Sequence, residues 1–282
     1  MTLRQLPEAK TFARPQNFQW DAPADVLARW SEKPLAAGEQ QGNVIAIFDI
    51  IGEDWWTGGG FTARDMQNAL RAVGPTSEVT VQINSPGGDV FEGIAIYNLL
   101  RDHKAKVTVE VVGLAASIAS IIAMAGDEIR MGLGTFMMVH NAWGVVVGNR
   151  HDMRDAAELF DGFDAALVDI YEARTKSKRG EIERLMDAES FMGPTEAVAK
   201  GFADAVDEAI EAKDADPKNL DTAVFARRRT EAALAKAGVT RGDRTSIINS
   251  LSGQRDAARD PAPRDAGLDL AAIRQLIDTI KT

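Results

Sequence analysis

The residues that could do chemistry centre on Ser117, which lies in a run of small side chains. The run at 113–120 (GLAASIAS) follows a valine-rich segment at 107–112 and leads into an apolar, helix-like segment. A strand that passes through alanines into a helix leaves a serine hydroxyl open to a substrate, beside the unpaired N–H groups of a helix N-terminus. Ser117 is therefore a candidate nucleophile. The alternative is that it caps a helix whose small residues pack closely on a sheet.

A serine hydroxyl is a weak nucleophile at its own pKa and needs a base within hydrogen-bond reach. The chain has three histidines, of which His103 ends a predicted helix and His151 begins one, as ordinary surface residues do. His140 instead ends the apolar run at 136–139, where a neutral imidazole suits a general base near pH 7. A buried histidine with satisfied hydrogen bonds fits the same pattern. We select His140 as the candidate base.

A glycine pair, Gly87-Gly88, closes the turn that follows a predicted strand at 78–84. Without side chains, these two residues can present backbone N–H groups to a developing oxyanion. Ser117, His140 and the glycine pair all lie just past the carboxyl ends of predicted strands, where sites form in α/β sheets. The topology therefore predicts that the three features converge.

The elements that must position these residues alternate between strands and helices. Apolar β-branched runs predict strands, and apolar residues at helical spacing predict helices. Their alternation predicts βαβ units with right-handed crossovers and an α/β fold. The predicted strands are 43–52, 78–84, 106–112, 128–131, 135–139 and 201–206; the predicted helices are 63–73 (N-cap Thr62), 90–100, 117–125, 151–175, 181–188 and 195–200 (N-cap Thr195); a loop is predicted at 141–149 and a break at 191–194.

The chain divides into three regions that differ in composition and in hydrophobic periodicity. Residues 1–42 contain four prolines and no sustained periodicity, which predicts an irregular N-terminal arm with at most a short helix at 24–31. Residues 43–210 carry the alternating elements and form the predicted domain. Residues 211–282 predict a polar, partly helical, scaffold-like tail, with helix candidates at 222–237 and 268–280 and a mobile stretch between them.

Composition excludes several classes of function. The net charge of −10 argues against a nucleic-acid binder, whose affinity rests on basic patches. The chain has no cysteine, so it has no disulfide, thiol nucleophile or thiolate metal site, and we expect neither a metal nor a cofactor. The first ten residues are polar, and no long uncharged apolar run follows. We therefore expect a cytoplasmic protein with no membrane partner.

Four motifs in order resemble the signatures of the ClpP-type serine peptidases, over residues 43–206. They are 83–88 (INSPGG), 113–117 (GLAAS), 138–140 (MVH), and Phe191 followed by 196–198 (EAV) and Gly201. The resemblance implies a ClpP/crotonase-type core, a spiral of stacked ββα units. It also implies a nucleophile at Ser117, a base at His140 and oxyanion-hole amides at Gly88 and Ile118. We add Gly87 and Asn141 as substrate-binding positions.

The third member of the triad is where the chain departs from this family. Where the family has an aspartate, alignment on Phe191 places Glu189, and Asp187 lies two residues earlier. A glutamate can also accept a hydrogen bond from the Nδ1–H of an imidazole and stabilise the imidazolium. We choose Glu189, with Asp187 as the alternative. Both carboxylates could equally be solvated at a helix end.

The arm and the tail resemble the extensions of ClpP-like head-maturation proteases of tailed bacteriophages and prophages. That resemblance implies phage capsid and scaffold proteins as substrates, a location in the host cytoplasm or the prohead interior, and a homo-oligomer of single or stacked rings. The predicted helix at 151–175 follows the histidine and is a candidate ring contact. Its Phe160 and Phe163 are equally compatible with a place in the core.

Other functions remain compatible with the same residues. One is an ordinary Clp-type proteolytic subunit that receives unfolded substrates from an ATPase ring. Others are a peptidase with a Ser–Lys dyad, related to the signal-peptide peptidases, and a crotonase-like acyl-CoA enzyme. A relative without catalytic activity, in which the core only forms rings, would be a structural or scaffold protein.

Overall fold

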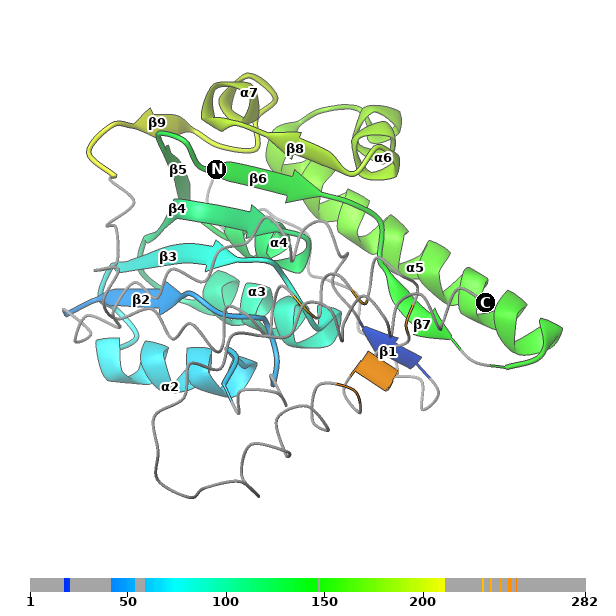
Figure 1. Ribbon diagram of the computed structural model, residues 1–282. Helices are drawn as coiled ribbons and strands as arrows, with labels where there is room; N and C mark the ends of the chain where they lie inside the picture. The colour runs from blue at the N-terminus through cyan, green and yellow to red at the C-terminus, as the bar shows by residue number, and fades with distance from the viewer. Residues whose placement is uncertain are drawn as a thin grey trace, which may run out of the picture. The chain divides into compact units, whose positions relative to one another are not determined.

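The computed structural model (Figure 1) describes residues 18–20, 42–53, 59–146 and 148–210, together with residues 230, 234, 239, 243, 244 and 247. The chain divides into two compact units, Met1–Thr245 and Ser246–Thr282. All labelled helices and strands belong to the first unit. The second unit is described only at Ile247. The predicted helices at 24–31 and 268–280 lie outside the described residues.

A parallel sheet forms the centre of the first unit, and this confirms the predicted α/β fold. Its strands lie in the order β2-β3-β4-β5-β9 and are joined by helical crossovers. Figure 1 shows the short helix α4 packed behind β4. The elements are β2 (Val44–Ile47), α2 (Ala63–Val73), β3 (Val79–Ser85), α3 (Val90–Asp102), β4 (Val107–Ala116), α4 (Ile118–Ala123), β5 (Glu128–Gly132) and β9 (Ala205–Asp207). Alternate residues of β3 are buried, as expected of a strand packed more tightly on one face.

Strand β4 pairs with two different strands along its length, and this change of partner shapes the region of the predicted site. Its first half pairs with β5, while Leu114–Ala116 pair with β6 (Phe136–Val139), which in turn pairs antiparallel with β8 (Ser190–Met192). Where the partner of β4 changes, the Asn84 side chain accepts a hydrogen bond from the Leu114 N–H at 3.1 Å. A Cβ atom on Gly113 would come within 2.5 Å of that Asn84 oxygen, so a larger residue would displace the Asn84 side chain from this bond. The side chain replaces a ladder partner where the register between β3 and β4 shifts.

The remaining helices follow β6. They are α5 (Arg150–Thr175), α6 (Arg179–Asp187) and α7 (Pro194–Ala199). Figure 1 shows α5 running beyond the sheet, with β7 (Gly144–Val146) beside its N-terminal end. The short strand β1 (Phe18–Trp20) pairs antiparallel with β7. Within the described residues, no helix combines the length and the apolar character needed to cross a bilayer.

Several local predictions need correction. The loop at 141–149 contains β7, the break at 191–194 contains β8, and the arm is not wholly irregular because β1 lies in it. These strands have three residues each, too few to show a period of two in the sequence. The N-cap of α7 is Gly193 rather than Thr195, because Pro194 takes the first helical position. The Thr62 cap of α2 is confirmed: its hydroxyl accepts from the Asp65 N–H, and the Thr62 N–H donates to the Asp65 carboxylate in return.

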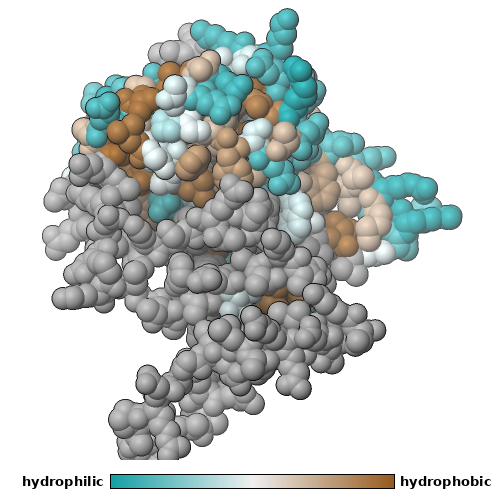
Figure 2. Space-filling model, turned by 45° about the horizontal axis from the view of Figure 1, so that its top comes forward, coloured by the Kyte–Doolittle hydropathy of each residue, from teal (hydrophilic) through white to brown (hydrophobic). Residues whose placement is uncertain are grey.

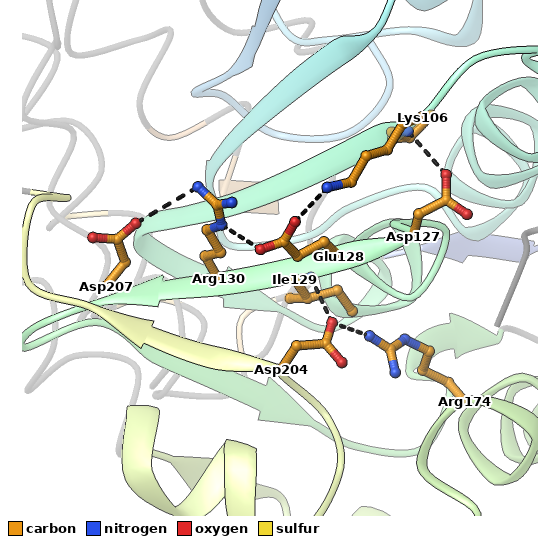
Figure 3. Close-up of polar contacts among 9 residues, drawn as sticks. Lys106, Asp127, Glu128, Ile129, Arg130, Arg174, Asp204 and Asp207 are labelled. Carbon is orange, nitrogen blue, oxygen red and sulfur yellow. Dashed lines mark hydrogen bonds and ion pairs between the residues drawn. The ribbon is translucent and has the colours of Figure 1, made fainter.

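Charged side chains join β4, β5 and β9 at the surface of the sheet (Figure 3). Glu128 accepts from Lys106 at 2.5 Å and from Arg130 at 2.7 Å, and Arg130 also faces Asp207 on β9. The hydrogen bonds from Arg130 and Lys106 lower the pKa of Glu128 from 4.5 to about 2. This network adds a side-chain ion pair between β5 and β9 to the hydrogen bonds of their ladder.

The lowered pKa predicts an acid-dependent contribution to stability. A carboxylate whose pKa falls on folding stabilises the protein above its unfolded pKa, here 4.5, and this stabilisation is lost as pH falls towards 2. We expect Glu128→Gln to lower the melting temperature at pH 7 by roughly 2–4 °C, and this deficit to shrink below pH 4.5.

Thermal unfolding of both proteins across this pH range tests the prediction. Asp102→Asn is the matched control, because the Asp102–Lys104 pair is highly exposed and we expect its loss to change little. A Glu128→Gln deficit that is the same at every pH would contradict the assigned cause.

Candidate active site

Ser117 and His140 lie in hydrogen-bond contact. The Oγ atom of Ser117 is 2.7 Å from Nε2 of His140. The contact follows from strand pairing, because Ala116 lies opposite Met138 in the β4–β6 ladder and the Ser117 N–H donates to the Met138 carbonyl at 2.9 Å. Each side chain therefore leaves the carboxyl end of one of two adjacent parallel strands. The two side chains that the sequence selected as nucleophile and base therefore lie next to each other in the structure.

The backbone of Ser117 is held in an unusual conformation. Its φ and ψ are 56° and −131°, a region that residues with a Cβ rarely occupy and that costs on the order of 1–3 kcal/mol. The residue sits at the turn from β4 into α4, and its side chain does not cap the helix. The capping alternative is therefore wrong. A sharp strand-to-helix turn of this kind projects a serine hydroxyl away from the backbone.

The glycine pair passes directly against Ser117. A Cβ atom on Gly87 would lie 2.6 Å from the Cβ of Ser117, and one on Gly88 would lie 2.2 Å from the Ile51 carbonyl oxygen. Both residues also have positive φ, so only glycine fits. Hydrogen bonds from the Ile51 N–H to the Gly87 carbonyl and from the Asp89 N–H to the Ile51 carbonyl hold this turn in place.

The two predicted oxyanion-hole donors border the same pocket as Ser117 and His140. Gly88 and Ile118 both line it. Within the described part of the chain, neither backbone N–H has a hydrogen-bond acceptor. Such N–H groups are available to a substrate oxygen.

The segment after His140 is anchored to two helices. Asn141, predicted to bind substrate, lines the pocket, and its side chain donates to Asp187 on α6 at 2.8 Å. The next residue, Ala142, donates its N–H to Asp164 on α5 at 2.6 Å. Burial raises the pKa of Asp164 to about 6, and the nearby carboxylates Asp161 and Asp187 add to this, while the bond from Ala142 opposes it.

Neither predicted acid is hydrogen-bonded to His140 among the described residues. Asp187 is engaged with Asn141 instead. Glu189 lies at the turn before β8 with φ of 47°, and its side chain is exposed. Within the described residues, its carboxylate has no hydrogen bond or ion pair. Ser190, the next residue, pairs with Val139 across β6 and β8, so the main chain brings Glu189 near the end of the histidine strand.

Three side chains at the site were not selected from sequence. Trp143 lines the pocket and is 40% exposed, so it forms an apolar rim. Tyr171 of α5 lines the pocket from the core side, and its hydroxyl contacts Ser120. Ser120 belongs to the small-residue run, but its partner lies 51 residues away, so no local pattern could reveal the contact. In the described part of the chain, no cluster of acidic and histidine side chains is arranged to hold a metal ion.

Comparison with known proteins shows which family the chain belongs to. The sequence pattern of the family described as Clp protease matches residues 64–209. The ATP-dependent Clp protease proteolytic subunit of Deinococcus radiodurans is 37% identical over 139 residues, which are 49% of this chain and 68% of that protein. The chain belongs to the Clp protease family. Membership implies serine peptidase activity, and the four motifs that resembled this family are thereby explained.

The raised pKa of Asp164 predicts that its ionised carboxylate destabilises the folded protein at neutral pH. An acid whose pKa rises on folding stabilises the folded state below its unfolded value near 3.8, and this is lost as pH rises through about 6. Asp164→Asn keeps an oxygen that can accept from Ala142 and cannot ionise. We expect it to be more stable than the wild type above pH 6, with the difference closing towards pH 4.

Denaturant unfolding at pH 4.5 and at pH 7.5, roughly one unit or more on either side of that pKa, measures this difference. Asp155→Asn is the control, because it removes an exposed carboxylate from the same helix. A gain in stability of equal size at both pH values would contradict the prediction.

Proposed function

We propose that the chain is a serine endopeptidase in which Ser117 is the nucleophile and His140 the general base. The observation that carries the proposal is the 2.7 Å contact between the Ser117 Oγ and the His140 Nε2. A neutral imidazole at this distance accepts the serine proton as the hydroxyl attacks a peptide carbonyl. His140 is 6% exposed, so bulk water competes little for this hydrogen bond.

The remaining steps use groups that border the same pocket. The N–H groups of Gly88 and Ile118 receive the carbonyl oxygen as it becomes negative. The imidazolium of His140 then gives its proton to the leaving amine, and an acyl group stays on Ser117. Water, deprotonated by His140, releases this acyl group. Gly87 leaves room for the substrate main chain, and Asn141 contacts the substrate beside the base.

The third member of the proposed triad is Glu189. Its place supports this role, because Glu189 precedes Ser190, the partner of Val139, and so lies beside the end of the histidine strand. Asp187 is the alternative and already bonds to Asn141. Either carboxylate would stabilise the imidazolium and hold the tautomer in which Nε2 accepts.

Labelling with a fluorophosphonate tests the nucleophile. We expect the wild type to form a covalent adduct at Ser117, and Ser117→Ala to lose both the adduct and peptide hydrolysis, by roughly 10³-fold or more in kcat. His140→Ala should fall to a similar level. Intact-protein and peptide mass spectrometry locate the adduct and also report self-processing of the arm or tail.

The matched controls are Ser77→Ala and His151→Ala, which change an exposed serine and an exposed histidine. Both should be labelled and active like the wild type. Unchanged labelling of Ser117→Ala would remove the proposal. In the same assay, a larger loss of kcat for Glu189→Gln than for Asp187→Asn supports Glu189, and the reverse order assigns the role to Asp187.

For the substrates, we propose capsid and scaffold proteins of a tailed bacteriophage, processed during head maturation. The support is the length of chain outside the family match, on both sides of residues 64–209. Such extensions suit targeting to an assembling shell. The site of action would be the host cytoplasm or the prohead interior.

The second candidate function is an ATP-dependent proteolytic subunit, because the Deinococcus relative carries that description. Incubation of the purified chain with folded capsid or scaffold protein, with and without ATP and a Clp-type unfoldase, separates the two. Head maturation predicts cleavage without ATP. Cleavage only with both ATP and the unfoldase would favour the second function.

We also propose assembly into rings. Five large apolar side chains among the described residues are more than a third exposed: Leu133, Phe136, Trp143, Met153 and Val206. Figure 2 shows apolar areas among the hydrophilic surface of the face in view. Exposed apolar surface on an otherwise charged protein is typical of contact surfaces. Met153 lies on the part of α5 that runs beyond the sheet, which suits a contact between rings.

A further inference from the structure

Behind Ser117 lies a buried polar pair that the proposed mechanism does not use. Ser120 of α4 and Tyr171 of α5 are 0% and 1% exposed, and their hydroxyl oxygens are 2.7 Å apart. A buried hydroxyl without a partner costs about 1–3 kcal/mol, so such pairs persist where their geometry is complete. Burial raises the pKa of Tyr171, which keeps the phenol protonated and able to donate.

The direction of these hydrogen bonds is determined by the third partner. The Ser120 Oγ is 2.6 Å from the main-chain carbonyl oxygen of Ser117, which can only accept. A serine hydroxyl has one proton, so Ser120 donates to Ser117 and Tyr171 must donate to Ser120. The result is a chain from the Tyr171 hydroxyl through Ser120 to the Ser117 carbonyl, in which each bond strengthens the next.

The carbonyl at the end of this chain belongs to the peptide unit that joins Ser117 to Ile118. A peptide unit is planar and trans, so its C=O and its N–H point in opposite directions. Holding the Ser117 oxygen towards Ser120 therefore determines the direction of the Ile118 N–H. That N–H has no acceptor among the described residues, and Ile118 borders the pocket.

We propose that Tyr171 and Ser120 are positioning residues that aim the Ile118 N–H at the oxyanion and maintain the strained backbone of Ser117. Neither needs to touch the substrate's reacting atoms. Because Tyr171 lies on α5, this places the orientation of the oxyanion hole under the control of the same helix that holds Ala142 through Asp164. The inference rests on the proposed function.

Peptide hydrolysis by Tyr171→Phe, Ser120→Ala and the double variant tests the inference. Misdirection of one oxyanion donor should lower kcat by roughly 10-fold or more with KM little changed, because that bond strengthens only in the transition state. Ser120→Ala should lose more than Tyr171→Phe, which keeps the bond to Ser117. The double variant should equal Ser120→Ala, because Tyr171 acts only through Ser120.

The chain offers a matched control. Tyr97 is its other tyrosine, is fully buried and lies on α3. Tyr97→Phe should retain the wild-type kcat. Rates are compared per Ser117 labelled by fluorophosphonate, so that loss of folded protein does not count as loss of rate. Values of kcat within twofold of the wild type for both Tyr171→Phe and Ser120→Ala would overturn the inference.

Hydrogen exchange provides a readout that does not need activity. The Ser120 N–H donates to the Ser117 carbonyl, so loosening that carbonyl should speed exchange at 117–124 in Ser120→Ala and leave α3 unchanged. Unchanged exchange at 117–124 would contradict the inference even in an active enzyme. A wild-type chain that is neither labelled nor hydrolytic would instead remove the proposed function, and exchange would still decide whether these residues hold the peptide.

Discussion

The parallel pairing of β4 with β6 is the constraint on which the site depends. It places Ala116 opposite Met138, and the Ser117 N–H continues the ladder to the Met138 carbonyl. Because both strands run in the same direction, their next residues emerge at one edge of the sheet. The distance between Ser117 and His140 is therefore determined by backbone hydrogen bonds, which are less easily perturbed than contacts between surface side chains.

Three features that reduce the stability of the folded state lie around that edge. Ser117 has a strained backbone, Asp164 ionises in a half-buried place, and the Gly87-Gly88 turn has a conformation that only glycine adopts readily. The apolar core of the sheet and its helices offsets them. Strain of this kind persists only where the surroundings determine the conformation, and here Ser120, Tyr171 and the β4–β6 ladder provide those surroundings.

Helix α5 has two separate relations to the site. Asp164 contacts the segment after the base, and Tyr171, two turns later, contacts the segment after the nucleophile. The spacing of seven residues places both on one face of the helix. One face of the helix therefore contacts the segment that follows the base and the segment that follows the nucleophile.

Sequence alone predicted the α/β core and the candidates Ser117, His140, Gly87 and Gly88, because these depend on local patterns: β-branched runs, small residues at a tight turn and glycines at positive φ. The short strands β7 and β8 and the partners of Ser120 escaped it, since each depends on a residue distant in sequence. The same limit applies to Glu189. Alignment with the family selects its position, but only tertiary structure decides where a flexible carboxylate points, and here Asp187 turns to Asn141. The tertiary structure thus determined how the side chains of the site are oriented, because their orientation arises from contacts between elements.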